Sequence, residues 1–115
     1  MKISFEGIGQ WAATFACSEE LTEGQPVKIS GNGAVGACAN GDGFCGIVMA
    51  VDDDDAACAV VMGGMVTVPC SGNVPALGWS GLSADGAGGV RADTAGQKYR
   101  VVDVNATGKT VTFVL

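Results

Sequence analysis

The stretch PVKISGNGAVGAC, from Pro26 to Cys38, carries the clearest hairpin signal in the chain. Gly31, Asn32 and Gly33 are residue types that adopt the positive φ angles of tight hairpin turns, and apolar residues alternate on both sides of them. Pro26 fits the first position of a strand, where no backbone donor is required. The stretch therefore predicts two antiparallel strands joined by a short turn.

Further strands are predicted downstream of this hairpin. The nearly continuous apolar run from Phe44 to Val51 predicts a strand that is buried on both faces, and it is the candidate central strand. The runs from Ala56 to Met62 and from Met65 to Cys70 predict two more strands, which gives three strands in meander order. At the end of the chain, Thr110 to Leu115 alternates between two faces.

The composition agrees with a β protein. Of the 115 residues, 19 are Gly, 15 are Val and only 4 are Leu, a balance that favours strands and tight turns over helices. A chain of this length forms one modest core and is too short for a two-domain enzyme. We therefore expect an all-β fold, a small barrel or a sandwich. Residues 1–20 are expected to form an N-terminal arm or edge strands, and residues 21–115 a single β domain.

The two halves of the chain are weakly similar to each other. The stretches from Gly24 and from Gly78 align with an offset of 53 residues, which pairs Ile29 and Ser30 with Leu82 and Ser83. A true repeat would give two similar strand-and-turn units packed together. Coincidence is the alternative, because Gly and Val recur throughout the chain. Beyond the second turn the offset is 55 residues, and the pairs are Val35 with Val90, Ala37 with Ala92, Phe44 with Tyr99, Ile47 with Val102, Met49 with Val104 and Cys58 with Phe113.

The charge pattern and the absence of histidine exclude several classes of function. Acidic residues outnumber basic residues by 12 to 6, the net charge is −6, and the basic residues are scattered. Nucleic-acid binding requires a concentrated basic footprint, so no nucleic-acid partner is expected. Histidine, the usual general base and the commonest metal ligand, does not occur in the sequence. With no catalytic constellation visible, we expect a protein that is not an enzyme.

The cysteines and the acidic run are also interpreted without a metal or a cofactor. Asp52 to Asp55 lack the ligand spacing of an EF-hand loop and are expected to form a solvated hairpin tip. The five cysteines include no C-x-x-C pair and are expected to be small buried side chains in a reduced compartment. They are Cys17, Cys38, Cys45, Cys58 and Cys70.

Three aromatic residues, Trp11, Phe15 and Trp79, are candidate interface residues. Both tryptophans lie in sequences with turn character, where the simpler interpretation is a rim residue that covers the core. An exposed tryptophan would instead serve as an interface anchor. The N-terminal stretch lacks the continuous apolar region of a secretory signal, and no apolar run approaches the ~18 residues of a membrane span. The sequence therefore predicts synthesis in the cytoplasm and no membrane partner.

Several phrases of the sequence resemble a family of phage proteins. They are EGQPVKIS at Glu23 to Ser30, FCGIV at Phe44 to Val48, VTVPC at Val66 to Cys70, PALGW at Pro75 to Trp79, and the later VVDV. With these phrases the chain is similar to small tailed-phage capsid proteins of the family with domain of unknown function 2190. The similarity covers residues 21–115. The family's second G-x-x-V phrase is replaced here by GWSGL, from Gly78 to Leu82.

This resemblance implies a role in decorating or stabilising a capsid. It implies a small β-barrel or β-clip-like fold, assembly as trimers on the capsid surface, and a location in the virion. The implied partners are further copies of the chain and a phage capsid protein, and no catalytic residue carries over from the family. The alternative is a small ligand-binding β module of a bacterial or prophage protein, because small barrels hold single ligands.

Overall fold

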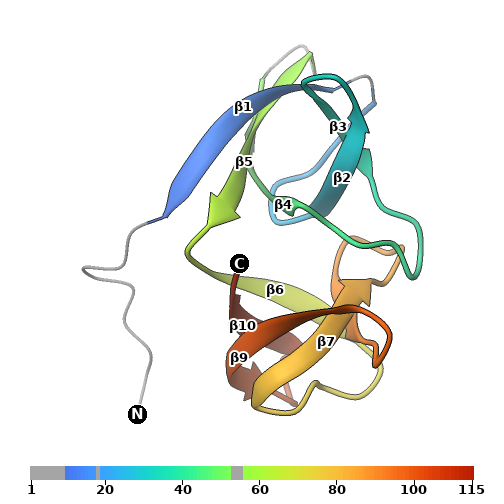
Figure 1. Cartoon of the computed structure of the whole chain (residues 1–115), viewed down its shortest axis with the longest axis vertical. Coiled ribbons are helices and arrows are strands. Elements are labelled where there is room, and N and C mark those ends of the chain that lie inside the picture. The colour runs from blue at the N-terminus through green and yellow to red at the C-terminus, as the bar shows by residue number, and fades with distance from the viewer. Residues whose placement is uncertain (1–9, 18, 53–55) are drawn as a thin grey trace.

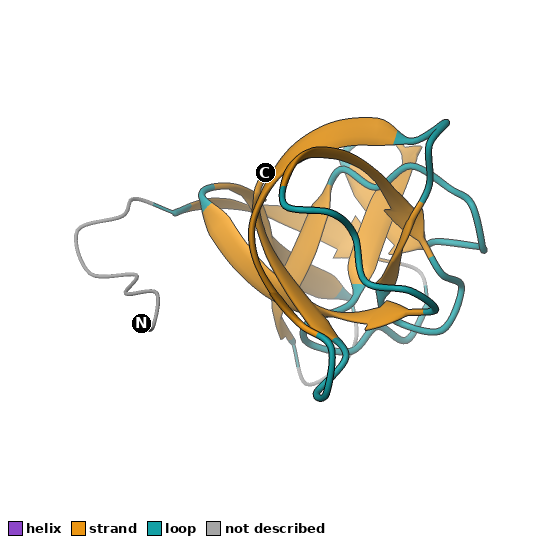
Figure 2. Cartoon of the chain, turned by 90° about the horizontal axis from the view of Figure 1, so that it is seen from below, coloured by secondary structure: helices purple, strands orange, loops and turns teal. Residues whose placement is uncertain are grey.

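The computed structural model describes residues 10–17, 19–52 and 56–115, and within these ranges it contains strands and turns but no helix. The strands form two closed barrels of five strands each, drawn one above the other in Figure 1. In Figure 2, which shows the molecule from below, the strands curve around each barrel. The all-β prediction is confirmed, and the structure selects a barrel over a sandwich. No helix in the described residues has the length and apolar character of a membrane span.

The chain completes the first barrel before it begins the second. The first barrel has the strand order β1-β3-β2-β4-β5 and consists of β1 (Trp11–Cys17), β2 (Pro26–Gly31), β3 (Ala34–Ala37), β4 (Gly46–Val51) and β5 (Ala57–Gly63). The second barrel has the order β6-β8-β7-β9-β10 and consists of β6 (Met65–Ser71), β7 (Gly78–Ala84), β8 (Val90–Ala92), β9 (Gln97–Asn105) and β10 (Thr110–Val114).

The two barrels have the same topology. In each, the first strand pairs in parallel with the third and antiparallel with the fifth. The second strand pairs antiparallel with both the third and the fourth, and the fourth pairs antiparallel with the fifth. The predicted similarity between the halves is therefore present at the level of strand pairing. Each half is a closed barrel.

The register of the repeat agrees only in part with the predicted alignment. Ile29 pairs with Val35 in the first barrel and Ala84 pairs with Val90 in the second, so the two hairpin ladders give an offset of 55 residues. On their other edges, β2 pairs Pro26 with Ile47 and β7 pairs Trp79 with Arg100, which gives the predicted offset of 53 residues. The predicted pairs Val35 with Val90 and Ala37 with Ala92 are correct.

The residue offset between the halves also departs from the prediction in the later strands of each barrel. Val48 pairs with Val60, and Val101 pairs with Phe113, so the offset is 53 where 55 was predicted. Each ladder then skips one residue, Met49 in β4 and Val102 in β9, so both barrels have an irregularity at the same place. The predicted pairs of Ile47 with Val102, Met49 with Val104 and Cys58 with Phe113 are therefore wrong by two residues.

The predicted central meander is also corrected. β4 pairs with β5 as expected, but β6 pairs with β10 and β8 and belongs to the second barrel. A turn at Gly64, with φ of 101°, redirects the chain between the barrels. β4 begins at Gly46, and its first half is buried on both faces as predicted, with Ile47 in one core and Val48 in the other. The second half is not, because Met49 is 49% exposed and Ala50 is also exposed.

The hairpin predicted from Pro26 to Cys38 is present as β2 and β3. Its turn contains Asn32 and Gly33, and Gly33 has a positive φ of 66° while Asn32 does not. Gly88, at the equivalent place between β7 and β8, has a φ of 92°. Glycine reaches this conformation without a Cβ clash, which explains why both turns use it.

Each barrel has an apolar core, and the core of the second barrel also contains residues of the first. The core of the first barrel contains Leu21, Val27, Val35, Val48, Val60, Cys17 and Cys58. The second core contains Val66, Val68, Cys70, Leu82, Val90, Val101, Val111 and Phe113 together with Phe44, Ile47 and Val61 from the first barrel. Each fully buried Val or Phe contributes roughly 1.5 to 3 kcal/mol. Because the second core is built by both halves, the barrels pack as one unit.

The N-terminal region predicted as an arm or edge strands contains β1. Residues 1–9 lie outside the described residues, whereas β1 pairs along Trp11 to Ala16 with β5 and at Ala16 and Cys17 with β3. Cys17 is buried in the core of the first barrel. β1 thus closes a barrel, and its removal would open that barrel.

Candidate functional site

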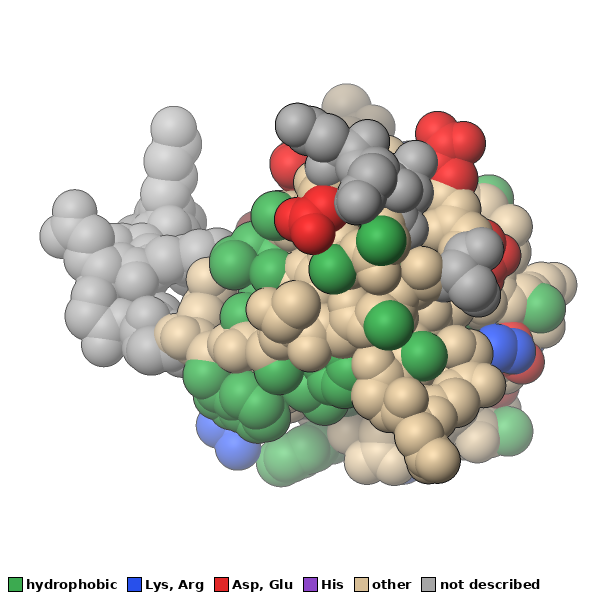
Figure 3. Space-filling model, turned by 90° about the horizontal axis from the view of Figure 1, so that it is seen from above, with side chains coloured by type: hydrophobic (Ala, Val, Ile, Leu, Met, Phe, Trp, Pro, Cys, Tyr) green, Lys and Arg blue, Asp and Glu red, His purple; other side chains and the backbone are tan. Residues whose placement is uncertain are grey.

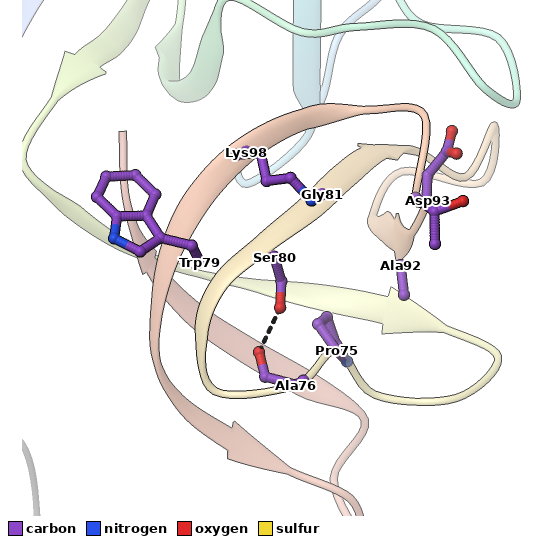
Figure 4. A pocket seen from close by; sticks show the side chains of 9 residues that line it. Pro75, Ala76, Trp79, Ser80, Gly81, Ala92, Asp93 and Lys98 are labelled. Carbon is purple, nitrogen blue, oxygen red and sulfur yellow. Dashed lines mark hydrogen bonds between the residues drawn. The ribbon is translucent and has the colours of Figure 1, made fainter.

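A surface pocket with a volume of about 290 Å³ lies on the second barrel. The polar side chains that line it include Ser80, Asp93 and Lys98 (Figure 4). The Ser80 hydroxyl donates to the Ala76 carbonyl oxygen at 2.7 Å, so it is held by the backbone and faces no base. The pocket therefore lacks the nucleophile-and-base geometry of a hydrolytic site.

Asp93 is occupied by structural contacts. One of its carboxylate oxygens accepts a hydrogen bond from the Ala95 amide at 3.0 Å, and the other lies 3.4 Å from the Arg91 guanidinium. The Ala95 amide is the main reason why the pKa of Asp93 is lower than usual. A carboxylate with a lowered pKa stays ionised at neutral pH and is a poor general acid.

A smaller pocket of about 180 Å³ lies beside the first one, and Trp79 and Lys98 line both. Gln97, Tyr99 and Arg100 complete its polar lining. Figure 4 shows the Trp79 indole pointing away from Ser80 and Pro75, so it stands at the margin of the larger pocket. Both pockets lie on the outside of the second barrel.

Among the described residues, Trp79 is the most exposed large apolar residue, with 66% of its surface accessible. Across neighbouring strands, Trp79 of β7 pairs with Arg100 of β9. Arg100 pairs in turn with Val114 of β10, and Val114 pairs with Met65 of β6. The Arg100 guanidinium carbon sits 5.1 Å from the centroid of the indole, a cation–π contact. The four side chains form one row across the outer face of the second barrel.

Trp11 is also exposed, at 58%, and lies at the start of β1. It pairs with Gly63 of β5, and a Cβ at Gly63 would clash with the indole Nε1. The indole therefore rests on bare backbone that only glycine provides. In Figure 3, a group of hydrophobic side chains gathers at the lower left of the view.

The three candidate interface residues do not form one site. Phe15 is half-buried and packs against the core of the first barrel, and it shares a face of β1 with Trp11. Trp79 lies on the second barrel. Among the described residues, three further large apolar side chains are exposed, and the alternation pattern gave no signal for them. They are Ile29 at 54%, Met49 at 49% and Leu77 at 64% exposure.

The cysteines have the environment of core residues rather than of reactive thiols. Cys58 and Cys70 are buried, and Cys38 and Cys45 are partly buried. Burial raises the pKa of Cys38 to about 11 and also raises the pKa of Cys45, Cys58 and Cys70. A raised pKa disfavours the thiolate, which is the nucleophile and the metal ligand.

The described residues include no group of three or more acidic, cysteine or histidine side chains placed to hold a metal ion. The acidic run Asp52 to Asp55 falls largely outside them, because residues 53–55 are not described. The predicted solvated tip and the calcium alternative therefore stay predictions.

Comparisons with known proteins give no assignment. No protein-family model matches the chain, and no curated protein matches it in sequence. The resemblance to the phage family with domain of unknown function 2190 thus stays a hypothesis based on the phrases quoted above.

Proposed function

We propose that this protein is a non-enzymatic structural protein of a phage or prophage, which associates with itself and binds to a capsid shell as a decoration or stabilising protein. The observation that carries the proposal is the exposure of Trp11 and Trp79 on two otherwise well-packed barrels. Large exposed aromatic side chains are typical of surfaces that a protein partner covers.

Two further features support a structural role. Ser80 and Asp93, which line the pocket on the second barrel, are engaged with backbone groups and with Arg91, so they are poorly suited to catalysis. The core shared by both barrels gives a small, rigid body, which suits a protein that must withstand conditions outside a cell.

The proposal is tested on particles and on the purified protein. Particles induced from a host that carries this gene are purified on a density gradient and analysed by quantitative mass spectrometry. We expect this protein in a fixed ratio to the major shell protein. Light scattering over a range of concentrations is expected to show an oligomer, for which the resemblance suggests a trimer. Particles that lack the protein, together with a strict monomer in solution, would overturn the proposal.

A small ligand-binding module is the second candidate function. It is favoured by the two adjacent pockets that share Trp79, one of which is also lined by Tyr99. The buried apolar side chains inside both barrels argue against a ligand held in a barrel interior. Tryptophan fluorescence of the Trp11→Phe variant, which leaves Trp79 as the only indole, is expected to stay constant across a panel of sugars and aromatic acids. A saturable change would favour this second function.

A further inference from the structure

The strand β1 has one paired edge and one largely unpaired edge. On one side it pairs with β5 from Trp11 to Ala16, and on the other side it pairs with β3 only at Ala16 and Cys17. Among the described residues, no strand pairs with Trp11 to Phe15 on that second side. Figure 1 shows this part of β1 running out to the left, away from β3.

Two backbone hydrogen bonds show which residues point toward the unpaired edge. The Ala16 amide donates to the Gly33 carbonyl oxygen on the β3 side at 2.9 Å, and the Cys17 amide donates to the Ala56 carbonyl oxygen on the β5 side at 3.2 Å. Backbone groups of a strand alternate between its two edges. Ala12 and Thr14 therefore direct their amide and carbonyl groups toward the unpaired edge.

This arrangement is self-complementary under a two-fold axis at Ala13. In an antiparallel pair centred there, Ala12 of one copy lies opposite Thr14 of the other, and each such pair exchanges two hydrogen bonds. Ala13 then faces its own equivalent across a non-hydrogen-bonded pair, where strands approach most closely and a small side chain fits. Trp11 lies opposite Phe15 of the second copy, on the same face.

The edge also lacks the features that prevent strand pairing. Residues 10–17 contain no charged residue and no proline, whereas natural edge strands commonly carry Lys, Pro or inward-pointing charges. The outward side chains Ala12, Thr14 and Ala16 are small and exposed. A second copy therefore approaches this edge without meeting like charge, although the chain as a whole has a net charge of −6.

We propose that two copies of this chain associate through the free edges of β1, pairing residues 11–15 antiparallel around Ala13 and covering Trp11 with Phe15 of the second copy. The inference rests on the proposed function in one respect: the β1 contact is the contact through which the proposed self-association takes place. A two-fold contact produces dimers, so it is distinguishable from a trimer formed through another surface.

Cysteine crosslinking tests the register directly. In the full chain, Ala13→Cys is expected to form an intermolecular disulfide in the presence of oxidised glutathione, because Cα atoms of a non-hydrogen-bonded pair lie ~4.5 Å apart. Ala12→Cys is the matched control and is expected to crosslink at least tenfold less, because its equivalents are diagonal neighbours about 7 to 8 Å apart. Peptide mapping separates these products from disulfides of the native cysteines. Equal or reversed yields would overturn the register.

A second pair of variants tests the edge itself. Thr14→Pro removes an amide that points to the free edge and leaves the β5 ladder intact, so we expect the dimer dissociation constant to rise at least tenfold. Thr14→Val keeps the amide and is expected to retain the dimer. Circular dichroism checks the fold of both, and the crosslinking result stands if Thr14→Pro does not fold.

An oligomer that persists in folded Thr14→Pro, or a wild-type trimer, overturns this contact alone. A strict wild-type monomer overturns both the contact and the self-association in the proposed function.

Discussion

Phe44 and Tyr99 stack face to face across the junction of the two barrels, with ring centroids 5.1 Å apart and planes inclined by 8°. Phe44 lies in the loop between β3 and β4, and Tyr99 lies in β9. Phe113 packs against both rings from the core of the second barrel. The three rings make the contact between the halves aromatic and well packed, a geometry worth about 0.5 to 1.5 kcal/mol per pair beyond its buried area.

Replacing Phe44 with Ala is expected to lower the free energy of unfolding by about 3 to 5 kcal/mol, because it leaves a cavity where Tyr99 and Phe113 now pack. Phe44→Leu is the milder control and is expected to cost less. Urea denaturation followed by circular dichroism measures both. A loss below about 1 kcal/mol for Phe44→Ala would show that the barrels do not depend on this contact.

The Tyr99→Phe variant distinguishes the contribution of the Tyr99 ring to stability from the contribution of its hydroxyl. The hydroxyl donates to the Phe44 carbonyl oxygen over a long 3.4 Å, so the variant is expected to lose less than about 1 kcal/mol. The measurement is the same urea titration. A loss as large as that of Phe44→Ala would assign the stability of the junction to the hydrogen bond instead of the stacked rings.

Gly46 is expected to resist substitution because of close backbone packing. A Cβ there would clash with the Val61 carbonyl oxygen and would lie 2.6 Å from the Val60 side chain. Gly46→Ala is therefore expected to cost about 1 to 3 kcal/mol by overpacking. At Gly43 nothing lies within 4 Å of the position that a Cβ would take, so Gly43→Ala is expected to be nearly neutral. Thermal unfolding of the two variants compares them, and equal melting temperatures would contradict the assignment.

The partly buried thiol of Cys38 predicts a loss of stability in alkali. Burial raises its pKa in the folded chain to about 11, whereas an unfolded thiol titrates at about 8.5. The contribution of this thiol to the free energy of unfolding is complete below about pH 8.5. It is lost as the pH rises to about 11, because the thiol of the unfolded chain releases its proton at a lower pH than the thiol of the folded chain. Urea midpoints are measured at pH 8, 9.5 and 10.5.

The Cys38→Ala variant isolates this titration. The other buried thiols and Tyr99 also have raised pKa values, so the variant still loses stability in alkali, but with a smaller slope than the wild type. Identical slopes for the two proteins would show that Cys38 does not contribute.

Trp11 and Trp79 are expected to differ in their effect on self-association. Trp11→Ala removes the side chain that faces Phe15 of the second copy, so the dimer dissociation constant is expected to rise at least tenfold. Trp79 lies on the other barrel and contacts Arg100, so Trp79→Ala is expected to leave dimerisation unchanged and to cost about 1 kcal/mol or less of stability. Sedimentation velocity measures both, and the opposite ranking would place the interface on the second barrel.

Sequence patterns located most strands but misjudged their register. The pairs Val35 with Val90 and Ala37 with Ala92 are correct, while pairs such as Ile47 with Val102 are two residues out of register. Side chains of a strand alternate with a period of two, so a slip of two residues leaves every side chain on the same face. The apolar pattern therefore has no means of detecting such an error.

Only part of the candidate interface could be predicted from the sequence. Trp11 and Trp79 were singled out as aromatic residues in turn-like sequence, and both are exposed. Phe15, singled out with them, is half-buried because it packs against the core of the first barrel, whereas Trp11, at the start of the same strand, is exposed. The exposure of Met49 follows from the skipped residue in the β4–β5 ladder, a feature of strand pairing that composition and periodicity do not encode.

The sequence by itself determined the all-β class and the β2–β3 hairpin, because turns such as the one at Gly33 depend on local backbone preferences. Only the tertiary structure decided that β5 and β6 separate into different barrels, and that β3 covers β1 at Ala16 and Cys17 alone. These are choices among partners distant in the chain, made by closing each sheet and burying its core. The unpaired edge of β1 is a consequence of that closure and not of any residue pattern within β1.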